Sequence, residues 1–296
     1  MGNVCYFNVN YECNNACRFC FSHNVGIDKR EMSISSFAKI IDKCNADDLI
    51  IINGGEPTLH SQFCEMVDIV VNKSLLCNIY SNGRILSEIA PKVELSNMVK
   101  FIIPIHGNRK IHDYLTRVTG SYDDAVHSLN KINGKIRYDL KFILNQEMMD
   151  DDFSIYSFIK DNDLLPENVV LARMNQTRKS KGNNYHIPAK IEEISYLKKC
   201  IEQLHYSYNL TLLDFPLCYF ESSLKEYVEI KKMSHGSKFY YSDDQVLFQK
   251  RKYLKKRLKH LECKECEHDK LCDYISESYD VLKYEKDKDY LLLDLE

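Results

Sequence analysis

The chain has 296 residues, a formal net charge of −3 and 28% charged residues. This near-neutral balance gives no reason to expect a nucleic-acid partner. No apolar run approaches the roughly 20 residues of a membrane-spanning helix. The first residues also lack the basic and apolar regions of a secretory signal. We therefore expect a cytoplasmic protein with one barrel-sized domain and a smaller companion domain.

Strands and helices are predicted to alternate over the first 180 residues, which indicates right-handed βαβ units and a parallel sheet. Six units fall short of the eight that close a barrel. The predicted fold is therefore α/β, a partial (β/α)6 TIM-like barrel with its sites at the carboxyl ends of the strands. The predicted strands are 4–9, 48–53, 75–80, 99–105, 138–144 and 169–174, and the predicted helices are 33–44, 62–72, 122–132 and 153–160.

The last third of the chain differs in character. A basic, polar loop at 177–184 indicates a domain boundary, which divides the chain into domains 1–180 and 181–296. The second part is expected to hold a small cluster-binding domain, for reasons given below. Its predicted elements are a helix at 191–206, a strand at 210–215, a hairpin of 239–241 with 246–248, and a basic helix at 250–260.

Cysteine is the unusual residue type, with 12 copies. Without a secretory signal, metal binding explains this richness better than disulfides do. Some of these cysteines are expected to be core thiols, because they lie singly in apolar segments: Cys5, Cys44, Cys64, Cys77 and Cys200. The others form two groups, one near each end of the chain.

The first group, Cys13, Cys17 and Cys20, has CxxxCxxC spacing directly after the first predicted strand. Three thiolates can hold an iron–sulfur cluster and leave one iron uncovered for a ligand. The alternative is a zinc site, which takes four ligands and would need His23 or a distant cysteine as the fourth.

Further motifs follow the next three strands. In Gly54-Gly55-Glu56-Pro57, the glycines allow close approach of the main chain to a ligand, and the glutamate can accept a hydrogen bond from an ammonium group. Ser81-Asn82-Gly83 follows the third strand. After the fourth strand come His106-Gly107, His112-Asp113, Arg117 and Gly120-Ser121-Tyr122.

These motifs, in this order over most of the first 175 residues, resemble the radical SAM superfamily. The resemblance implies that Cys13, Cys17 and Cys20 are the catalytic ligands of a [4Fe–4S] cluster that binds S-adenosylmethionine (SAM). One-electron cleavage of SAM there would release a 5′-deoxyadenosyl radical. The implied cofactor-binding residues are Phe19, Gly54, Gly55, Glu56, Pro57, Ser81, Asn82, Arg117 and Asn145.

Several of the implied contacts are open at this point. Arg117 would pair with the SAM carboxylate, although a plain surface arginine is an equal alternative. Many relatives carry serine at the end of strand four, where this chain has Pro104 or His106, which leaves the ribose contacts in doubt. Asn145, after the fifth strand, and Arg173, on the sixth strand, are weaker candidates.

The second cysteine group consists of Cys218, Cys263, Cys266 and Cys272. It resembles the SPASM or twitch extension of radical SAM enzymes, which implies a second, auxiliary [4Fe–4S] cluster. A structural Cys₄ zinc site is the alternative.

The fourth-strand motifs and the second cysteine group together resemble enzymes that modify ribosomally made peptides. The implied outcome is a cross-link, a thioether, an epimerised centre or a dehydrogenation. Alternatives are a dehydrogenase or rearrangement enzyme for a small molecule, and a non-catalytic scaffold or sensor. The implied partners are a peptide, an electron donor such as flavodoxin or ferredoxin, and a separate leader-binding protein, because the first strand begins near residue 4.

Overall fold

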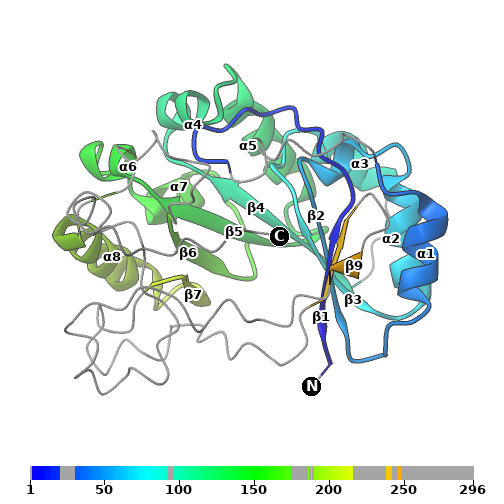
Figure 1. The fold of residues 1–296 in the computed structure, drawn as a ribbon. Helices are drawn as coiled ribbons and strands as arrows, with labels where there is room; N and C mark the ends of the chain where they lie inside the picture. Colours follow the sequence, from blue (N-terminus) through cyan, green and yellow to red (C-terminus); the bar gives the residue numbers. More distant parts are fainter. Residues whose placement is uncertain are drawn as a thin grey trace, which may run out of the picture.

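A single curved sheet organises the described part of the chain (Figure 1). The computed structural model describes residues 2–20, 31–92, 97–174, 186, 188, 190–215, 238–241 and 246–247. The strands are β1 (Val4–Asn8), β2 (Leu49–Asn53), β3 (Leu76–Tyr80), β4 (Val99–Ile105), β5 (Arg137–Leu144), β6 (Val169–Arg173), β7 (Leu210–Leu213), β8 (Lys238–Tyr241) and β9 (Val246–Leu247).

Strands β1 to β7 lie side by side in sequence order, and all their pairings are parallel. Strand β8 pairs in parallel with the other edge of β1, and β9 pairs antiparallel with β8. Among the described strands, β7 and β9 form the two edges. The carboxyl ends of the parallel strands therefore meet at one rim, as a partial barrel requires.

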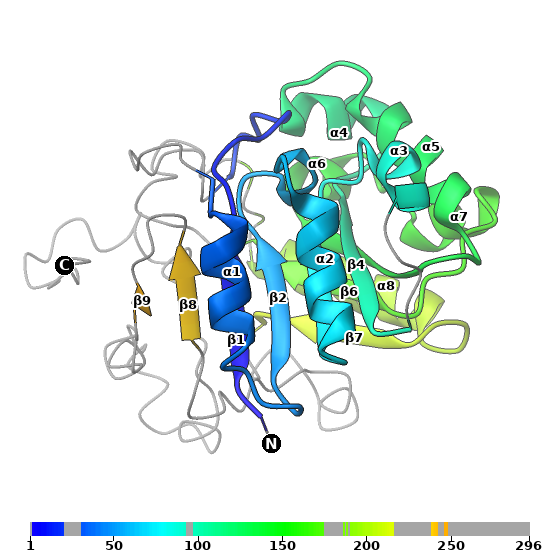
Figure 2. The same ribbon diagram turned by 90° about the vertical axis from the view of Figure 1, so that its right-hand side faces the viewer.

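Helices cover the outer face of the sheet, and α1 and α2 lie side by side over β1 and β2 (Figure 2). The strands alternate as expected for a two-sided sheet: Phe101, Ile103 and Ile105 of β4 pack in the core with the helices. On the opposite face, Lys100 and Asp139 form an ion pair of 2.8 Å. The helical elements are α1 (Ile34–Ile41), η1 (Pro57–Leu59), α2 (Phe63–Asn72), α3 (Leu86–Ile89), η2 (Ala90–Lys92), α4 (Arg109–Thr116), α5 (Ser121–Ile132), α6 (Gln146–Asp150), α7 (Ile155–Asp161) and α8 (Lys190–Leu204).

The predicted α/β partial barrel is confirmed, and further strands extend its sheet at both edges. The sequence predicted six strands in the barrel, whereas β7 continues the sheet by pairing Val169 of β6 with Leu210. The hairpin strands β8 and β9 also join this sheet, through the pairing of β8 with β1. The sheet thus contains strands from both sides of residue 180, and the division into domains 1–180 and 181–296 stays a prediction.

The short helices that the sequence pattern missed include α4 and α6. Each of these two begins at an asparagine cap: Asn108 Oδ1 accepts a hydrogen bond from Ile111 N at 3.0 Å, and Asn145 Oδ1 accepts one from Met148 N at 2.9 Å. Helices of this length give little periodicity to read, so their caps are the main sequence signal. None of the described helices combines the length and apolar character needed to cross a membrane.

Candidate active site

The three cysteines of the first group lie together in the loop after β1, each partly exposed and none in a disulfide. The pKa of Cys13 is raised to about 11 and that of Cys17 to about 12, mainly by burial and to a smaller extent by the neighbouring sulfurs. Three neighbouring thiols are the donor set that an iron–sulfur cluster with one open iron requires, so these residues fit that group. Binding of a metal would displace the thiol protons.

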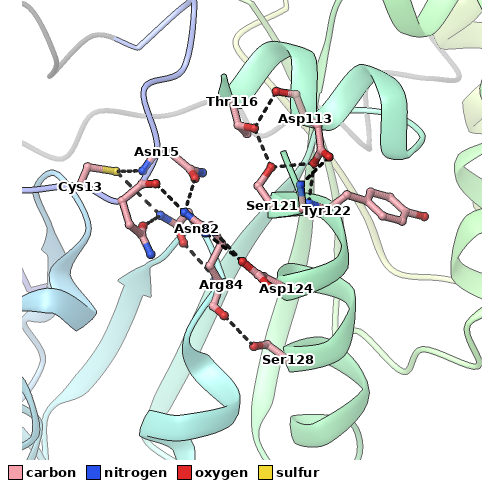
Figure 3. Close-up of polar contacts among 12 residues, drawn as sticks. Cys13, Asn15, Asn82, Arg84, Asp113, Thr116, Ser121, Tyr122, Asp124 and Ser128 are labelled. Atoms are coloured by element: carbon pink, nitrogen blue, oxygen red, sulfur yellow. Dashed lines mark hydrogen bonds and ion pairs between the residues drawn. The ribbon is translucent and has the colours of Figure 1, made fainter. Parts of the chain in front are cut away.

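The spacer between Cys13 and Cys17 is held from outside the loop (Figure 3). Asn14 Oδ1 accepts a hydrogen bond from Asn82 Nδ2 at 2.6 Å, and the Asn14 carbonyl accepts one from Arg84. Inside the loop, Asn15 N donates to Cys13 Sγ at 3.4 Å. The turn after β3 therefore fixes the path of the chain between the first two cysteines.

The end of helix α4 supports the same loop from a second side. Ala16 N donates to the Thr116 carbonyl at 3.0 Å, and Arg18 N donates to the Leu115 carbonyl at 2.9 Å. Arg18 Nε also donates to the Tyr114 carbonyl at 2.9 Å, and its guanidinium lies 4.0 Å from the centre of the Tyr114 ring. The last carbonyls of a helix have no partner within the helix, and here the cysteine loop supplies their donors.

The glycines of Gly54-Gly55-Glu56-Pro57 allow this segment to pack against the chain that leads into the cysteine loop. Gly55 N donates to the Asn10 carbonyl at 2.9 Å, and Glu56 N donates to the Glu12 carbonyl at 2.7 Å. A Cβ on Gly55 would lie 2.1 Å from the Glu12 oxygen, and one on Gly54 would lie 2.4 Å from the Asn10 oxygen. Only glycine fits at either position, so contact with the protein itself is sufficient to explain both.

The Glu56 side chain is buried and joins two motifs. Its Oε1 accepts hydrogen bonds from Thr58 N, Thr58 Oγ1 and Ser81 Oγ, at 3.2, 2.6 and 2.8 Å. Its Oε2 accepts one from Asn82 N at 2.6 Å. Burial raises the pKa of this carboxyl, and the hydrogen bonds oppose that shift. Protein donors thus already occupy much of the carboxylate that was predicted to accept a hydrogen bond from the SAM ammonium group. The next motif residue, Pro57, is buried at the start of η1.

Asp113 connects α4 to the start of α5 (Figure 3). Its carboxylate accepts hydrogen bonds from Gly120 N at 2.7 Å, Ser121 Oγ at 3.0 Å and Tyr122 N at 2.9 Å. Those three bonds hold the pKa of Asp113 below its usual value despite partial burial. Thr116 Oγ1, in the last turn of α4, lies 2.6 Å from Ser121 Oγ. The motif residues from 112 to 122 therefore brace the helix end on which the cysteine loop rests.

Two buried histidines lie beside the loop at the end of β4. His106 N donates to His112 Nδ1 at 3.3 Å, and the His106 ring meets the edge of Phe19 at 4.9 Å between centroids. Burial lowers the pKa of His112 to about 4 and holds the pKa of His106 well below its usual value. Both rings are therefore neutral at pH 7. The predicted cofactor contact Phe19 is thus packed against the strand-four residue His106.

Three other predicted contacts occupy different settings. Arg117 is exposed just past the end of α4, in the left-handed region with φ of 59°. Asn145 is buried, and its amide donates to the carbonyls of His106 and Ile143 besides capping α6. Arg173 Nε pairs with Glu193 Oε2 at 2.9 Å in a buried ion pair between β6 and α8. The assignments of Arg117 and Asn145 to SAM stay predictions.

The cysteines of the second group lie outside the described residues, as does the alternative zinc ligand His23. Their roles as ligands stay predictions. Cys5, Cys77 and Cys200, expected as core thiols, are buried in the hydrophobic core.

The sequence did not single out Arg84, which the structure places at the centre of the contacts to the cysteine loop. Its only signal in the sequence is its place directly after Ser81-Asn82-Gly83. Its ion-pair partner, Asp124, is 40 residues away in the chain, so no local spacing could have joined the two.

Taken together, these features define a class: α/β proteins with a parallel partial barrel and a three-cysteine loop at the carboxyl end of its first strand. The family follows from comparison with known proteins. Residues 7–151 match the model of the Radical SAM superfamily. This part of the chain is a radical SAM domain, which agrees with the resemblance of its motifs. The cofactors of that superfamily are SAM and a [4Fe–4S] cluster, as predicted.

Relatives of known function match parts of the chain. Mycofactocin maturase MftC of Mycolicibacterium smegmatis is 35% identical over 129 residues, which are 42% of this chain and 33% of the relative. Fe-coproporphyrin III synthase of Methanosarcina barkeri is 23% identical over 163 residues, which are 53% of this chain and 41% of the relative. The chain thus matches about a third of the length of the maturase.

Solved structures support the fold. The structure described as native anSMEcpe with bound AdoMet and Kp18Cys peptide has a TM-score of 0.65 at 14% identity, covering 92% of this chain and 88% of that one. Streptococcus suis SuiB bound to S-adenosylmethionine has a TM-score of 0.58 at 14% identity, covering 82% of this chain and 59% of that one. At this identity the likeness establishes the fold alone.

Proposed function

We propose that the protein is a radical SAM maturase that modifies a ribosomally made peptide. The observation that carries this proposal is the direct contact between two parts of the chain: the cysteine loop rests on the end of α4 through Ala16 and Arg18. That helix end is braced by Asp113, within the motifs that resemble peptide-modifying members of the superfamily. The likeness to MftC, a maturase by name, supports the same reading.

In this proposal Cys13, Cys17 and Cys20 hold the [4Fe–4S] cluster. With SAM bound, that cluster supplies a 5′-deoxyadenosyl radical for hydrogen abstraction from the substrate. The protein's own part is to position the cluster and SAM and to exclude water. Glu56 fixes the turn after β3 against the segment after β2, and that turn fixes the cysteine loop. The neutral rings of His106 and His112 close the site beside Phe19.

Four further elements belong to the proposal. Cys218, Cys263, Cys266 and Cys272 would bind an auxiliary [4Fe–4S] cluster in a small domain over residues 181–296. A flavodoxin or ferredoxin would donate the electron. A separate leader-binding protein would present the peptide. The cysteine spacing CxxC within Cys263–Cys266 supports the auxiliary site.

Co-expression with candidate precursor peptides, followed by mass spectrometry, tests the peptide proposal. A mass change in the peptide that disappears in the Cys17→Ala variant would support it. An unmodified peptide from every short reading frame near the gene, with an active enzyme, would contradict it.

A small-molecule substrate is the second candidate. The match to Fe-coproporphyrin III synthase, a protein whose name refers to a porphyrin, favours it. The two candidates differ in one measurable way: an enzyme for a small molecule converts a metabolite, seen as a SAM-dependent mass change, in an extract from which peptides have been removed. A protein that binds SAM and forms no 5′-deoxyadenosine under any of these conditions would be a scaffold or sensor.

A further inference from the structure

Arg84 reaches both the cysteine loop and helix α5 (Figure 3). Its Nη1 donates to the Asn14 carbonyl and, at 3.3 Å, to Asn15 Oδ1. On its other side, Nε and Nη2 donate to Asp124 Oδ2 at 3.0 and 2.9 Å. The guanidinium therefore ties the spacer between Cys13 and Cys17 to helix α5.

This arrangement needs the shape of an arginine. The planar guanidinium has five N–H donors that point in fixed, different directions, so one side chain can serve a carbonyl and a carboxylate at once. A lysine ammonium is a compact charge at the end of a flexible stem and cannot hold both partners in that geometry. The side chain is only 17% exposed, against 47% for Asp124. The positive charge is thus more shielded from water than the negative charge that pairs with it.

A second side chain of the same turn, Asn82, also contacts the cysteine loop. Asn82 lies two residues earlier in the same turn, and its Nδ2 donates to Asn14 Oδ1 at 2.6 Å and approaches Cys13 Sγ at 3.8 Å. Hydrogen bonds and charges beside a cluster's sulfur ligands set its reduction potential. Arg84 brings a permanent positive charge to neighbouring atoms of the same spacer, the Asn14 carbonyl and Asn15 Oδ1.

We propose that Arg84 is a positioning residue for the cluster: it fixes the Cys13–Cys17 spacer against Asp124 and raises the reduction potential by its charge. The inference rests on the proposed cluster at the three cysteines. Addition of an electron makes a cluster more negative, and a nearby cation stabilises that state. Arg84 thereby makes the one-electron reduction easier and keeps the loop in place while it happens.

The test measures the cluster itself, without substrate. Wild type, Arg84→Gln, Arg84→Lys and Asp124→Asn are reconstituted anaerobically, and midpoint potentials are followed by electron paramagnetic resonance. The rate of iron loss to a chelator is measured in parallel, and circular dichroism checks folding. The matched control is Arg109→Gln. Arg109 is exposed and pairs at 2.7 Å with Asp123, the neighbour of Asp124 on α5.

We expect Arg84→Gln to shift the potential negative, with the reduction equilibrium changing on the order of tenfold. Arg84→Lys keeps the charge, so its potential should stay near that of wild type while iron is lost several-fold faster. Asp124→Asn should also lose iron faster, and Arg109→Gln should match wild type in both measurements. If Arg84→Gln fails to fold, the lysine and asparagine variants decide: wild-type iron retention in both overturns the proposal.

Two other results would overturn it. One is a folded Arg84→Gln variant with a full cluster and an unchanged potential. The other is an equal shift in Arg109→Gln, which would show only a general effect of surface charge. These outcomes can be told apart from failure of the proposed function. If the wild-type protein assembles no cluster, the proposed function itself fails; the two results above concern only the role of Arg84.

Discussion

The backbone N–H of Asn82 donates to Glu56 Oε2 at 2.6 Å, and this bond joins the loop after β2 to the turn after β3. Ser81 Oγ donates to the other oxygen of the same carboxylate at 2.8 Å. Because Asn82 in turn holds Asn14, a buried carboxylate far from the cysteines in sequence determines how their loop is placed. Each of these bonds can be removed by a single substitution.

Glu56→Gln should destabilise the protein without changing its shape. The new amide NH₂ must face at least one of the donors from Thr58, Ser81 and Asn82, which leaves a buried donor without an acceptor. We expect a loss of about 1 to 3 kcal/mol in the free energy of unfolding. Anaerobic urea unfolding measures it. Glu65→Gln, an exposed carboxylate on α2, is the control and should stay within about 0.5 kcal/mol of wild type. Equal stabilities for the two variants would refute the linking role of Glu56.

Gly55→Ala should disrupt the cysteine loop. Its methyl group would lie 2.1 Å from the Glu12 carbonyl oxygen, so the backbone must move at the start of the loop. We expect iron content after reconstitution to fall to a small fraction of the wild-type value. Gly134→Ala is the matched control: its φ is 68°, but no atom lies within 4 Å of the added methyl group. That variant should cost about 1 kcal/mol and keep its iron. Full iron content in Gly55→Ala would contradict the close packing described above.

Stability should depend on His112 between pH 7 and pH 5. Burial lowers the pKa of His112 to about 4, below its ordinary value of 6.5. In this range the His112 ring becomes protonated in the unfolded chain but stays neutral in the folded protein. The free energy of unfolding therefore falls as the pH falls. The contribution of one such group is about 1 to 2 kcal/mol over these two pH units.

His112→Asn removes that proton uptake and keeps an acceptor for His106 N, so its stability should vary less with pH than that of wild type. Urea unfolding at pH 7, 6 and 5 gives the slopes. His127→Asn, on an exposed position of α5, should keep the wild-type slope. A His112→Asn slope as steep as that of wild type would exclude His112 as the cause.

The sequence predicted those features that depend on local pattern. Short apolar segments that alternate with helical ones located β1 to β6, and the spacing of Cys13, Cys17 and Cys20 was enough to suggest their chemistry. Local sequence pattern could not predict the contacts that hold the site, because these contacts join residues far apart in the chain: Arg84 with Asp124, and Glu56 with Asn82. Nor could local pattern show that β7 and β8 join the barrel sheet, since strand pairing is a property of the folded chain. The glycines before Glu56 were expected to lie beside a ligand, which stays a prediction; the structure shows that they also pack closely against the protein itself.

The central claim is that Cys13, Cys17 and Cys20 hold a cluster that cleaves SAM reductively. The most direct test is to reconstitute the protein anaerobically with iron and sulfide, add dithionite and SAM, and quantify 5′-deoxyadenosine. The account predicts that wild type forms 5′-deoxyadenosine and that Cys17→Ala does not. A core-thiol variant such as Cys77→Ala is the control and should form it. No 5′-deoxyadenosine from wild type, or the same yield from Cys17→Ala, would contradict the claim.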